Sequence, residues 1–554
     1  MPTRPTTPLA RPLEPELQRL AAELLVVRAS GHLADHQRRY PRWELANAEL
    51  QALLELGVGG VILLGAGAAE LALRCRQLRD WAGQPLLLCA DVEEGVGQRF
   101  EGASWLVPPL GLGRLHGRDP QLALDLAESY GRCTGRDAAR AGLNWVLAPV
   151  CDVNNNPANP VINVRAWGEE PAVVAELTAA FCRGLQGAGV LGCAKHFPGH
   201  GDTSSDSHLE LPVLPHRRER LEAIELPPFR AAIAAGVAAV MTAHLLLPVL
   251  DPERPATLSS AVLSQLLRRD LGFRGLVVTD ALVMEAISRH HGAGEATVLA
   301  LEAGADLVLM PADAHQAIEA IVAALASGRL SRQQLEASAE RRRAALEQVR
   351  TGRGDPGLKG DPLTAAQPDR PLEQELVERT LEQRGGSWAS AKASADPAIL
   401  GPGVNLLRLD SALQAPFLPP TAPALTLPAA AGLRPCLLDN LHPSLWRPDP
   451  QAPLNLDQLG EGPVLLQLFL RGNPFRGSAG GDEPWPAAVA QLLRHGRLAG
   501  LAIYGSPYLW EALQPLLPEP LPAAYSPGQM PRAQAWLLGR LGLADRSAGQ
   551  AFTD

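Results

Sequence analysis

The sequence lacks several features that would each place a protein in a particular class. Its seven cysteines are scattered, odd in number and never spaced as a C-x-x-C pair. This pattern excludes a disulfide framework and a zinc knuckle, and it indicates reduced, buried thiols. No apolar run reaches the roughly 18 residues that a membrane-spanning helix needs.

An excess of positive charge is also missing. The formal net charge is −9 and the pI is near 5.9, so no electrostatic footprint for nucleic acid or for an anionic membrane surface is present. The first twenty residues, MPTRPTTPLARPLEPELQRL, lack the apolar core of a signal peptide. We therefore expect a cytoplasmic protein that binds neither nucleic acid nor membranes, and we leave its oligomeric state open.

The chain is globular in composition and too long for one ordinary core. It has 554 residues, of which 46% are hydrophobic and 20% charged, so two or more domains are expected. The stretch TGRGDPGLKGDPLTAAQPDRP, rich in Gly, Pro and Asp, follows a charged helical segment and is typical of a linker. We predict a catalytic domain at 1–350, a linker at 351–371 and a smaller α/β sandwich-type domain at 372–554.

Eight short apolar runs recur in the first 310 residues, and segments with helical spacing separate them. Buried parallel strands read as continuous apolar runs, so this alternation predicts a (β/α)8 TIM-like barrel, with a doubly wound open sheet as the alternative. The runs are residues 24–30, 60–65, 85–91, 143–150, 189–196, 237–244, 275–280 and 306–310.

Charged residues and histidines stand at or just after the carboxyl ends of five of these runs. In a barrel all these ends lie on one face, where active sites are built. A strand leaving the core explains one or two polar residues, but it explains five such ends poorly. The residues are Asp91, Asp152, Arg165, Lys195, His196, His244 and Asp280.

The segment KHFPGHGDTSSDSHLELP at 195–212 concentrates three histidines, His196, His200 and His208. His196 and His200 are four residues apart, but a proline and two glycines among them argue against the helix that would put both on one face. Zinc held by a loop and a purely structural loop remain alternatives. The third interpretation is catalytic, because a carboxylate two residues from an imidazole can fix its tautomer and favour its protonated form.

That third interpretation needs a nucleophile, and Asp280 is the candidate. It follows the apolar run LVVT and would face the same barrel mouth as Asp206 and His208. A carboxylate nucleophile together with a positioned proton donor is what retaining glycoside hydrolysis requires.

At these residues the chain resembles glycoside hydrolase family 3, in its β-N-acetylglucosaminidase (NagZ-like) branch. The motif at 195–212 and GFRGLVVTDALVMEAI at 272–287 carry the resemblance, and segments at 90–100, 149–171 and 240–248 support it. The resemblance covers roughly residues 20 to 350 well and the last domain more weakly.

The resemblance implies a role for each matching position. Asp280 would be the nucleophile, and His208 the acid/base, oriented by Asp206. The D-S-H signature marks the N-acetylglucosaminidase branch, so terminal β-linked N-acetylglucosamine (GlcNAc) is the expected substrate, from cell-wall fragments or chitin oligomers, with no cofactor and no metal. The substrate-binding residues would be Asp91, Arg99, Arg165, Lys195, His196 and His244.

Two departures from the family pattern affect the expected pocket. The family's E-G-G is Glu93-Glu94-Gly95 here, and its R-S-F-G is R-A-W-G at 165–168. Trp167 could stack on a sugar or belong to the core, whereas Trp145, inside an apolar run, is expected in the core. The alternatives to a hydrolase of GlcNAc are a phosphorylase, a β-glucosidase and a catalytically silent sugar-binding protein.

Overall fold

The structure is a computed structural model. It describes residues 15–203, 206–207, 209–351, 362–388, 403–410, 415–471 and 483–543. Across these residues, none of the helices combines the length and the hydropathy needed to cross a membrane.

A closed barrel of parallel strands forms the first unit. Its strands pair in the orders β4-β3-β2-β1-β8 and β5-β6-β7, and single parallel bridges, Trp145 to Leu191 and Val278 to Leu307, join the two ladders. Each strand overlaps one of the eight expected runs, so the predicted barrel is confirmed and the open sheet is wrong. The strands are β1 Leu25–Ser30, β2 Gly60–Leu64, β3 Leu87–Ala90, β4 Trp145–Val146, β5 Cys193–Phe197, β6 Ala239–Thr242, β7 Leu276–Val278 and β8 Val308–Leu309.

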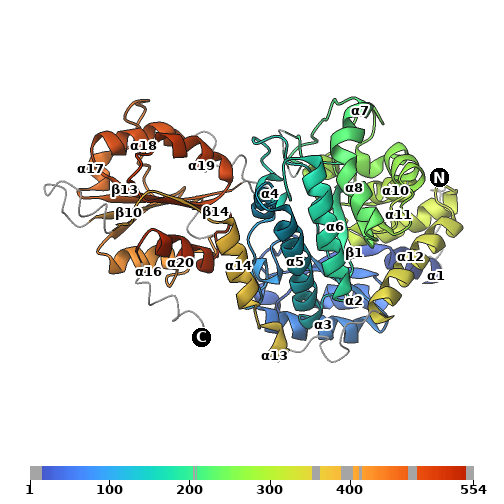
Figure 1. The fold of residues 1–554 in the computed structure, drawn as a ribbon. Helices are drawn as coiled ribbons and strands as arrows, with labels where there is room; N and C mark the ends of the chain where they lie inside the picture. The colour runs from blue at the N-terminus through green and yellow to red at the C-terminus, as the bar shows by residue number, and fades with distance from the viewer. Residues whose placement is uncertain are drawn as a thin grey trace, which may run out of the picture.

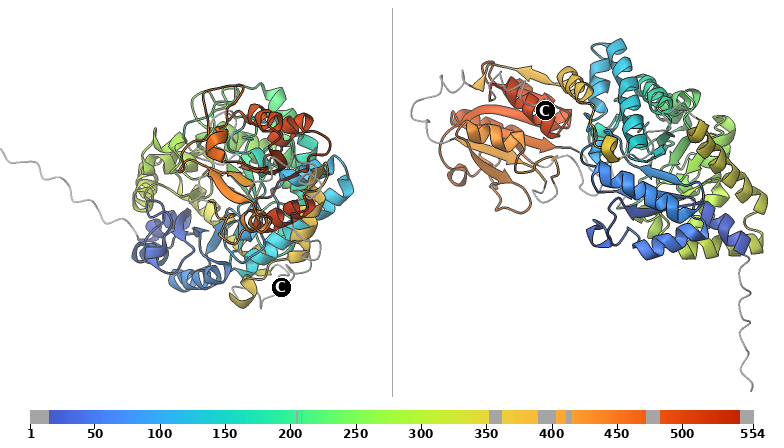
Figure 2. Two further views of the ribbon diagram at one scale, coloured as in Figure 1. Left: turned by 90° about the vertical axis from the view of Figure 1, so that its left-hand side faces the viewer. Right: turned by 90° about the horizontal axis from the view of Figure 1, so that it is seen from below.

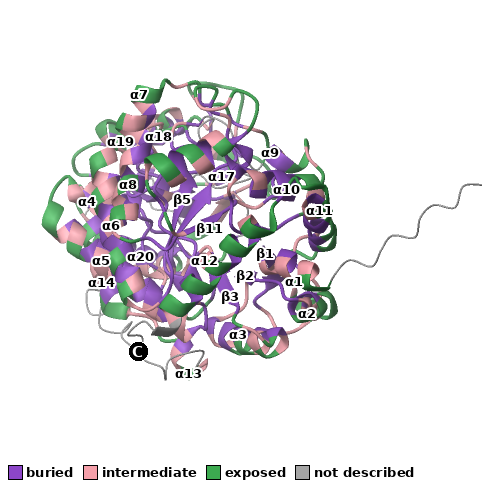
Figure 3. Cartoon of the chain, turned by 90° about the vertical axis from the view of Figure 1, so that its right-hand side faces the viewer, coloured by how far each residue is buried: buried purple, intermediate pink, exposed green. Residues whose placement is uncertain are grey.

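Helices surround the strands, with their buried faces toward the barrel and their exposed faces outward (Figure 3). One apolar cluster fills the space between strands and helices, and a second fills the barrel interior. Trp145 belongs to the interior cluster and is fully buried, as expected. The main helices are α1 Pro15–Glu23, α2 Asn47–Leu56, α3 Ala68–Ala82, α4 Leu110–His116, α5 Pro120–Arg140, α6 Pro171–Gly187, α8 Leu226–Ala234, α10 Ala293–Ala303, α11 Ala314–Ser327 and α12 Arg332–Thr351.

Helix α12 covers the amino ends of the strands, seen in front of the strands in Figure 3. The buried guanidinium of Arg342 donates to the carbonyls of Gly59 at 3.0 Å and Pro85 at 2.6 Å, just before β2 and β3. Asp306, just before β8, accepts from Ser338 and Arg341 of α12 at 2.9 and 2.8 Å. Polar contacts therefore close this end, and the carboxyl ends of the strands form the opposite end, the mouth of the barrel.

The second unit is a six-stranded sheet with helices on both faces (Figure 1). The strand order is β11-β10-β12-β13-β14-β9, and only the edge pair β14–β9 is antiparallel. Helices α16 and α20 cover one face, and α17, α18 and α19 the other. The elements are β9 Glu382–Arg384, β10 Val404–Arg408, α16 Pro423–Ala430, β11 Arg434–Leu438, α17 Leu456–Leu459, β12 Val464–Leu470, α18 Trp485–Arg494, β13 Leu498–Gly505, α19 Pro507–Leu513, β14 Ala523–Ser526 and α20 Pro531–Arg540.

This second unit lies against the carboxyl side of the barrel (Figures 1 and 2). Helices α13 Pro362–Ala365 and α14 Arg370–Thr380 pack on the barrel and lead into the sheet. Both begin within the segment expected as a linker, and residues 352–361 of that segment lie outside the described residues. The boundaries at 350 and 372 stay a prediction.

The contacts of Asp306 at the amino end of the barrel, called the barrel floor, can be tested by their contribution to stability. Its carboxylate is 1% exposed and accepts from Arg341, Ser338, Arg268 and the amide of Val277. Asp306→Ala removes a buried carboxylate and leaves the partly buried Arg268 and the other donors without their partner, so we expect a loss of about 3–5 kcal/mol in the free energy of unfolding. Denaturant titration measures it.

The matched control is Asp313→Ala, at the exposed N-cap of α11. Loss of that cap costs about 1 kcal/mol. Equal losses in the free energy of unfolding at the two positions would show that the Asp306 contacts contribute no more than a local hydrogen bond.

Candidate active site

A buried cluster of charges stands at the carboxyl ends of β3 and β5. The ammonium of Lys195 lies 2.6 Å from Asp91 Oδ1 and 2.7 Å from Glu93 Oε1. Arg165 forms two bonds of 2.8 Å to the two oxygens of the same Glu93. Sequence reasoning named Asp91, Lys195 and Arg165, and the structure brings all three together around Glu93, which it had noted only as part of the E-E-G departure.

The charges in this cluster stabilise one another. Burial alone raises the pKa of Glu93, but Arg165 and Lys195 outweigh it and hold that pKa well below the usual range. Burial lowers the pKa of Lys195, yet Asp91 and Glu93 keep it above its ordinary value. The cluster thus presents fixed charges, which can bind sugar hydroxyls without changing protonation near neutral pH.

Asp152 forms a second centre beside the first. It is 1% exposed, and its carboxylate accepts from the amides of His196 and His200 and lies 2.8 Å from His196 Nδ1. Burial raises the pKa of Asp152, but the two histidines outweigh it and lower that pKa. Asp152 therefore sets the orientation of the His196 ring, and sequence reasoning placed it at the mouth without assigning that role.

His200 stabilises the loop that contains Asp206 of the candidate dyad. It is 2% exposed, with Nδ1 2.7 Å from Thr203 Oγ1 and Nε2 2.9 Å from Ser207 Oγ. Burial lowers its pKa to about 4, so the ring is neutral at pH 7. Ser207 lies between the two members of the proposed dyad, so His200 links the start of the loop to its functional part.

The same loop is held closely against the segment that follows β4. Asn159 donates to the carbonyls of His200 and Gly201 at 2.9 and 2.8 Å. A Cβ atom at Gly201 would stand 1.8 Å from the carbonyl oxygen of Val153, so only glycine allows this approach. Asp206 is 5% exposed, whereas His208 lies outside the described residues.

Asp280 stands two residues after β7 on the same side of the barrel. Its Oδ1 accepts from the amide of Ala281 at 2.7 Å. His244 is fully buried, with Nδ1 2.8 Å from Thr257 Oγ1 and Nε2 3.0 Å from the carbonyl of Ala281. A carbonyl only accepts, so His244 carries its proton on Nε2 and contacts the backbone next to Asp280.

Two other residues lie apart from the buried cluster. Arg99 is exposed, and its Nε donates to the carbonyl of Asp91 at 3.1 Å. Trp167 is 1% exposed and packs against Tyr130 and Phe181, with ring centroids 5.4 and 5.2 Å away. Trp167 therefore belongs to the core and does not offer a face to a sugar ring.

Metal binding has no support among the described residues. No group of three or more His, Cys, Asp or Glu side chains in that part of the chain is placed to hold an ion. His196 and His200, whose spacing raised the question, contact Asp152, Thr203 and Ser207 instead. The expectation that no metal is needed stays a prediction.

Two family models match the chain. The one described as glycosyl hydrolase family 3 N terminal domain matches residues 17–344, and the one described as bacterial glycosyl hydrolase family 3 C-terminal domain matches residues 400–542. A β-hexosaminidase of Stenotrophomonas maltophilia is 39% identical over 271 residues, which cover 48% of this chain and 80% of that protein.

Solved structures agree with this fold over nearly the whole chain. A glycoside hydrolase family 3 β-N-acetylglucosaminidase from Paenibacillus sp. str. FPU-7 is 29% identical with a TM-score of 0.73, covering 96% of this chain and 97% of that one. A β-glucoside phosphorylase is 19% identical with a TM-score of 0.71, covering 95% and 92%. At that identity, the second likeness shows the fold alone.

Glu93 provides a test of the charge cluster. Glu93→Gln keeps the shape but removes the charge that faces Lys195 and Arg165, so we expect about 3–5 kcal/mol of lost stability at pH 7. Because the folded pKa of Glu93 lies below an unfolded value of roughly 4.3, its contribution is complete above that pH and is lost as the pH falls through the folded value. The difference from wild type should therefore shrink as unfolding is measured at successively lower pH, below about pH 4.

Glu336→Gln is the control, because that carboxylate is exposed and forms only a surface pair with Arg332. We expect it to cost less than about 0.5 kcal/mol. A cost for Glu93→Gln that does not change with pH would contradict the ion-pair description.

Proposed function

Because the chain belongs to glycosyl hydrolase family 3 and is a glycoside hydrolase, we propose that it is a retaining exo-β-N-acetylglucosaminidase. The observation that carries the proposal is the charge cluster of Glu93, Lys195, Asp91 and Arg165 at the mouth of the barrel where Asp280 also stands. Fixed cations and carboxylates side by side supply both donors and acceptors for the hydroxyls of one sugar.

The reaction we propose has two displacements. The Asp280 carboxylate attacks the anomeric carbon while protonated His208 gives its proton to the leaving oxygen, so the glycosidic bond breaks as a glycosyl-aspartate ester forms. Neutral His208 then takes a proton from water, whose oxygen attacks the same carbon and releases Asp280. Two inversions retain the β-configuration.

Asp206 has the role of orienting His208 in this scheme. Its carboxylate is 5% exposed, and a buried charge attracts an imidazolium more strongly than an exposed one does. Because His208 lies outside the described residues, its role rests on the D-S-H motif and on the position of its neighbours Asp206 and Ser207. The bracing of Ser207 by His200 supports it, since an acid/base group must be held at a fixed place.

The substrate class rests on the relatives and on the motif. The Stenotrophomonas protein is named β-hexosaminidase, and the Paenibacillus structure is that of a β-N-acetylglucosaminidase. We propose terminal, non-reducing β-GlcNAc as the substrate, from cell-wall fragments or chitin-type oligosaccharides. A cytoplasmic location and a part in peptidoglycan turnover stay predictions.

One experiment tests the proposal directly. Wild-type protein is given a chromogenic aryl β-GlcNAc and, in parallel, the aryl β-glucoside, each with and without phosphate. We expect faster release from the β-GlcNAc substrate and free GlcNAc as product in both buffers. A preference for glucoside would indicate a β-glucosidase, a sugar phosphate would indicate a phosphorylase, and no turnover would indicate a silent sugar-binding protein.

The nucleophile assignment gives the next prediction. Asp280→Asn removes the attacking charge at nearly constant shape, so we expect activity to fall on the order of a thousandfold or more. The control is Asp313→Asn, an exposed N-cap where asparagine serves as well as aspartate. A mechanism-based fluorosugar should label wild-type protein at Asp280, and a label on another residue would reject the assignment.

The dyad gives a prediction about pH. Asp206→Asn keeps an acceptor but loses the charge that favours the imidazolium, so His208 should lose its proton at lower pH. The limb of the pH–rate profile that reports this deprotonation should move to lower pH, and the maximal rate should fall. An unmoved limb would separate Asp206 from the proton donor.

His208→Ala tests the same dyad by leaving-group dependence. An activated aryl β-GlcNAc needs little proton donation, so its glycosylation should survive, whereas deglycosylation slows and a burst of aglycone appears. Near wild-type rates on substrates with poor leaving groups would show that the proton donor lies elsewhere.

A further inference from the structure

Two polar contacts join the second unit to loops at the barrel mouth. Arg471, just after β12, donates from Nη2 to Glu94 Oε1 at 2.7 Å, and the two side chains are 13% and 1% exposed. The hydroxyl of Tyr508, in the first turn of α19, accepts from Asn154 Nδ2 at 2.6 Å and donates to Glu169 Oε1 at 2.8 Å. These contacts are partly buried, and polar contacts shielded from water restrict both partners more than exposed ones do.

The first contact, between Arg471 and Glu94, is linked to the charge cluster through the backbone of one turn. Glu94 follows Glu93 directly, and the amides of both residues donate to Gln98 Oε1, at 3.1 and 2.9 Å. The second oxygen of Glu94 accepts from the indole of Trp105 at 3.2 Å. A shift of the Glu94 carboxylate therefore shifts the backbone from which Glu93 projects toward Lys195 and Arg165.

The second contact reaches the same cluster from the other side. Asn154 is fully buried, and its Oδ1 accepts from the amide of Asn163 at 3.0 Å. Asn163 has a φ of +44° and begins the short 3-10 turn that ends at Arg165. Tyr508 thus fixes Asn154, and Asn154 fixes the turn that presents Arg165.

Both paths end on one ion pair, since Glu93 and Arg165 bond each other twice at 2.8 Å. We infer that the second unit holds the sugar-binding cluster in its working geometry, with Arg471 and Tyr508 as positioning residues that do not touch the reacting atoms. The inference rests on the proposed function, in which this cluster binds the hydroxyls of the sugar.

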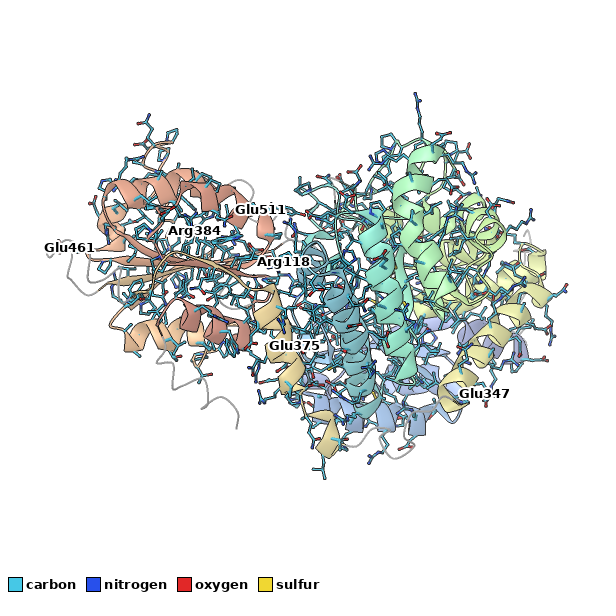
Figure 4. All side chains as sticks on the ribbon, viewed as in Figure 1. Arg118, Glu347, Glu375, Arg384, Glu461 and Glu511 are labelled. Atoms are coloured by element: carbon cyan, nitrogen blue, oxygen red, sulfur yellow. The ribbon has the colours of Figure 1, made fainter. Side chains whose placement is uncertain are left out.

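The contacts are not a general property of the boundary between the units. Arg118 also lies there (Figure 4). Arg118 Nη2 donates to the carbonyl of Arg379 at 3.0 Å, at an exposed position, and this bond leads to neither Glu93 nor Arg165. Arg118 therefore provides a control, an arginine that bonds α14, the helix leading into the second unit, without reaching the cluster.

The experiment compares Arg471→Gln with Arg118→Gln in the full chain. Calorimetric titration with GlcNAc gives the Kd, and an aryl β-GlcNAc gives kcat and KM. We expect Arg471→Gln to raise the Kd and KM on the order of tenfold with kcat within about threefold, because the cluster binds hydroxyls and Asp280 is untouched. Arg118→Gln should leave all three within about twofold of wild type.

A double-mutant cycle identifies the route through Glu94. If Arg471 acts through Glu94, adding Arg471→Gln to Glu94→Gln should change the Kd by less than about twofold. The same tenfold loss in both backgrounds would overturn the inference, as would an unchanged Kd in Arg471→Gln. An equal rise in Arg471→Gln and Arg118→Gln would also overturn it, because any boundary contact would then suffice.

Tyr508→Phe tests the second path and remains decisive if Arg471→Gln fails to fold. It deletes one hydroxyl, and Tyr525→Phe is its control, since that hydroxyl bonds only the carbonyl of Gly505 within the second unit in the described part of the chain. We expect the Kd of Tyr508→Phe to be roughly threefold higher than that of wild type and the Kd of Tyr525→Phe to be unchanged. Equal Kd values for the two variants would overturn the inference. A wild type that neither binds nor cleaves β-GlcNAc would instead reject the proposed function itself.

Discussion

The mouth of the barrel depends on a buried carboxylate that stays ionised. Glu93 is 4% exposed, and burying a lone charge costs several kcal/mol. Lys195 and Arg165 offset that cost, and they in turn keep their own charges because Glu93 and Asp91 face them. Glu93 depends on its two cations to stay ionised at this depth, so its place in the site requires Lys195 and Arg165 together.

The three histidines of the 195–212 segment have different roles in the proposed mechanism. His196 is oriented by Asp152 toward the mouth, while His200 is neutral and ties the loop together through Thr203 and Ser207. Only His208 is left for proton transfer in the proposed mechanism. Among the described residues of this segment, His196 and His200 form hydrogen bonds with Asp152, Thr203 and Ser207.

Sequence patterns predicted the barrel well because strand identity is a local property. Eight apolar runs coincide with eight strands, and the charged groups at their ends gather at one mouth, as parallel pairing requires. The central place of Glu93 was missed because its partners are 72 and 102 residues away, and no local pattern reports such a pairing. The contact of Arg471 with Glu94, which are 377 residues apart, could not be predicted for the same reason.

Trp167 is another residue whose surroundings could not be predicted from the local sequence. Trp167 follows Arg165, the proposed sugar-binding residue, in a loop, which left its side chain equally suited to a sugar or to the core. Contacts with Tyr130 and Phe181, from helices α5 and α6, decide in favour of the core. The packing of α12 against the amino end of the barrel could not be predicted either, since the charged run around Arg342 is typical of a solvated helix face.

The pairing of β1 with β8 sets a constraint on how the protein is made. Leu25 and Val26 lie opposite Val308 and Leu309 in the ladder, so β1 waits for this partner through the synthesis of about 280 residues. At typical rates of synthesis that wait lasts on the order of tens of seconds. During it, one edge of β1 is an open template for pairing with other chains. This edge of β1 is covered only once β8 has been synthesised and has paired with it.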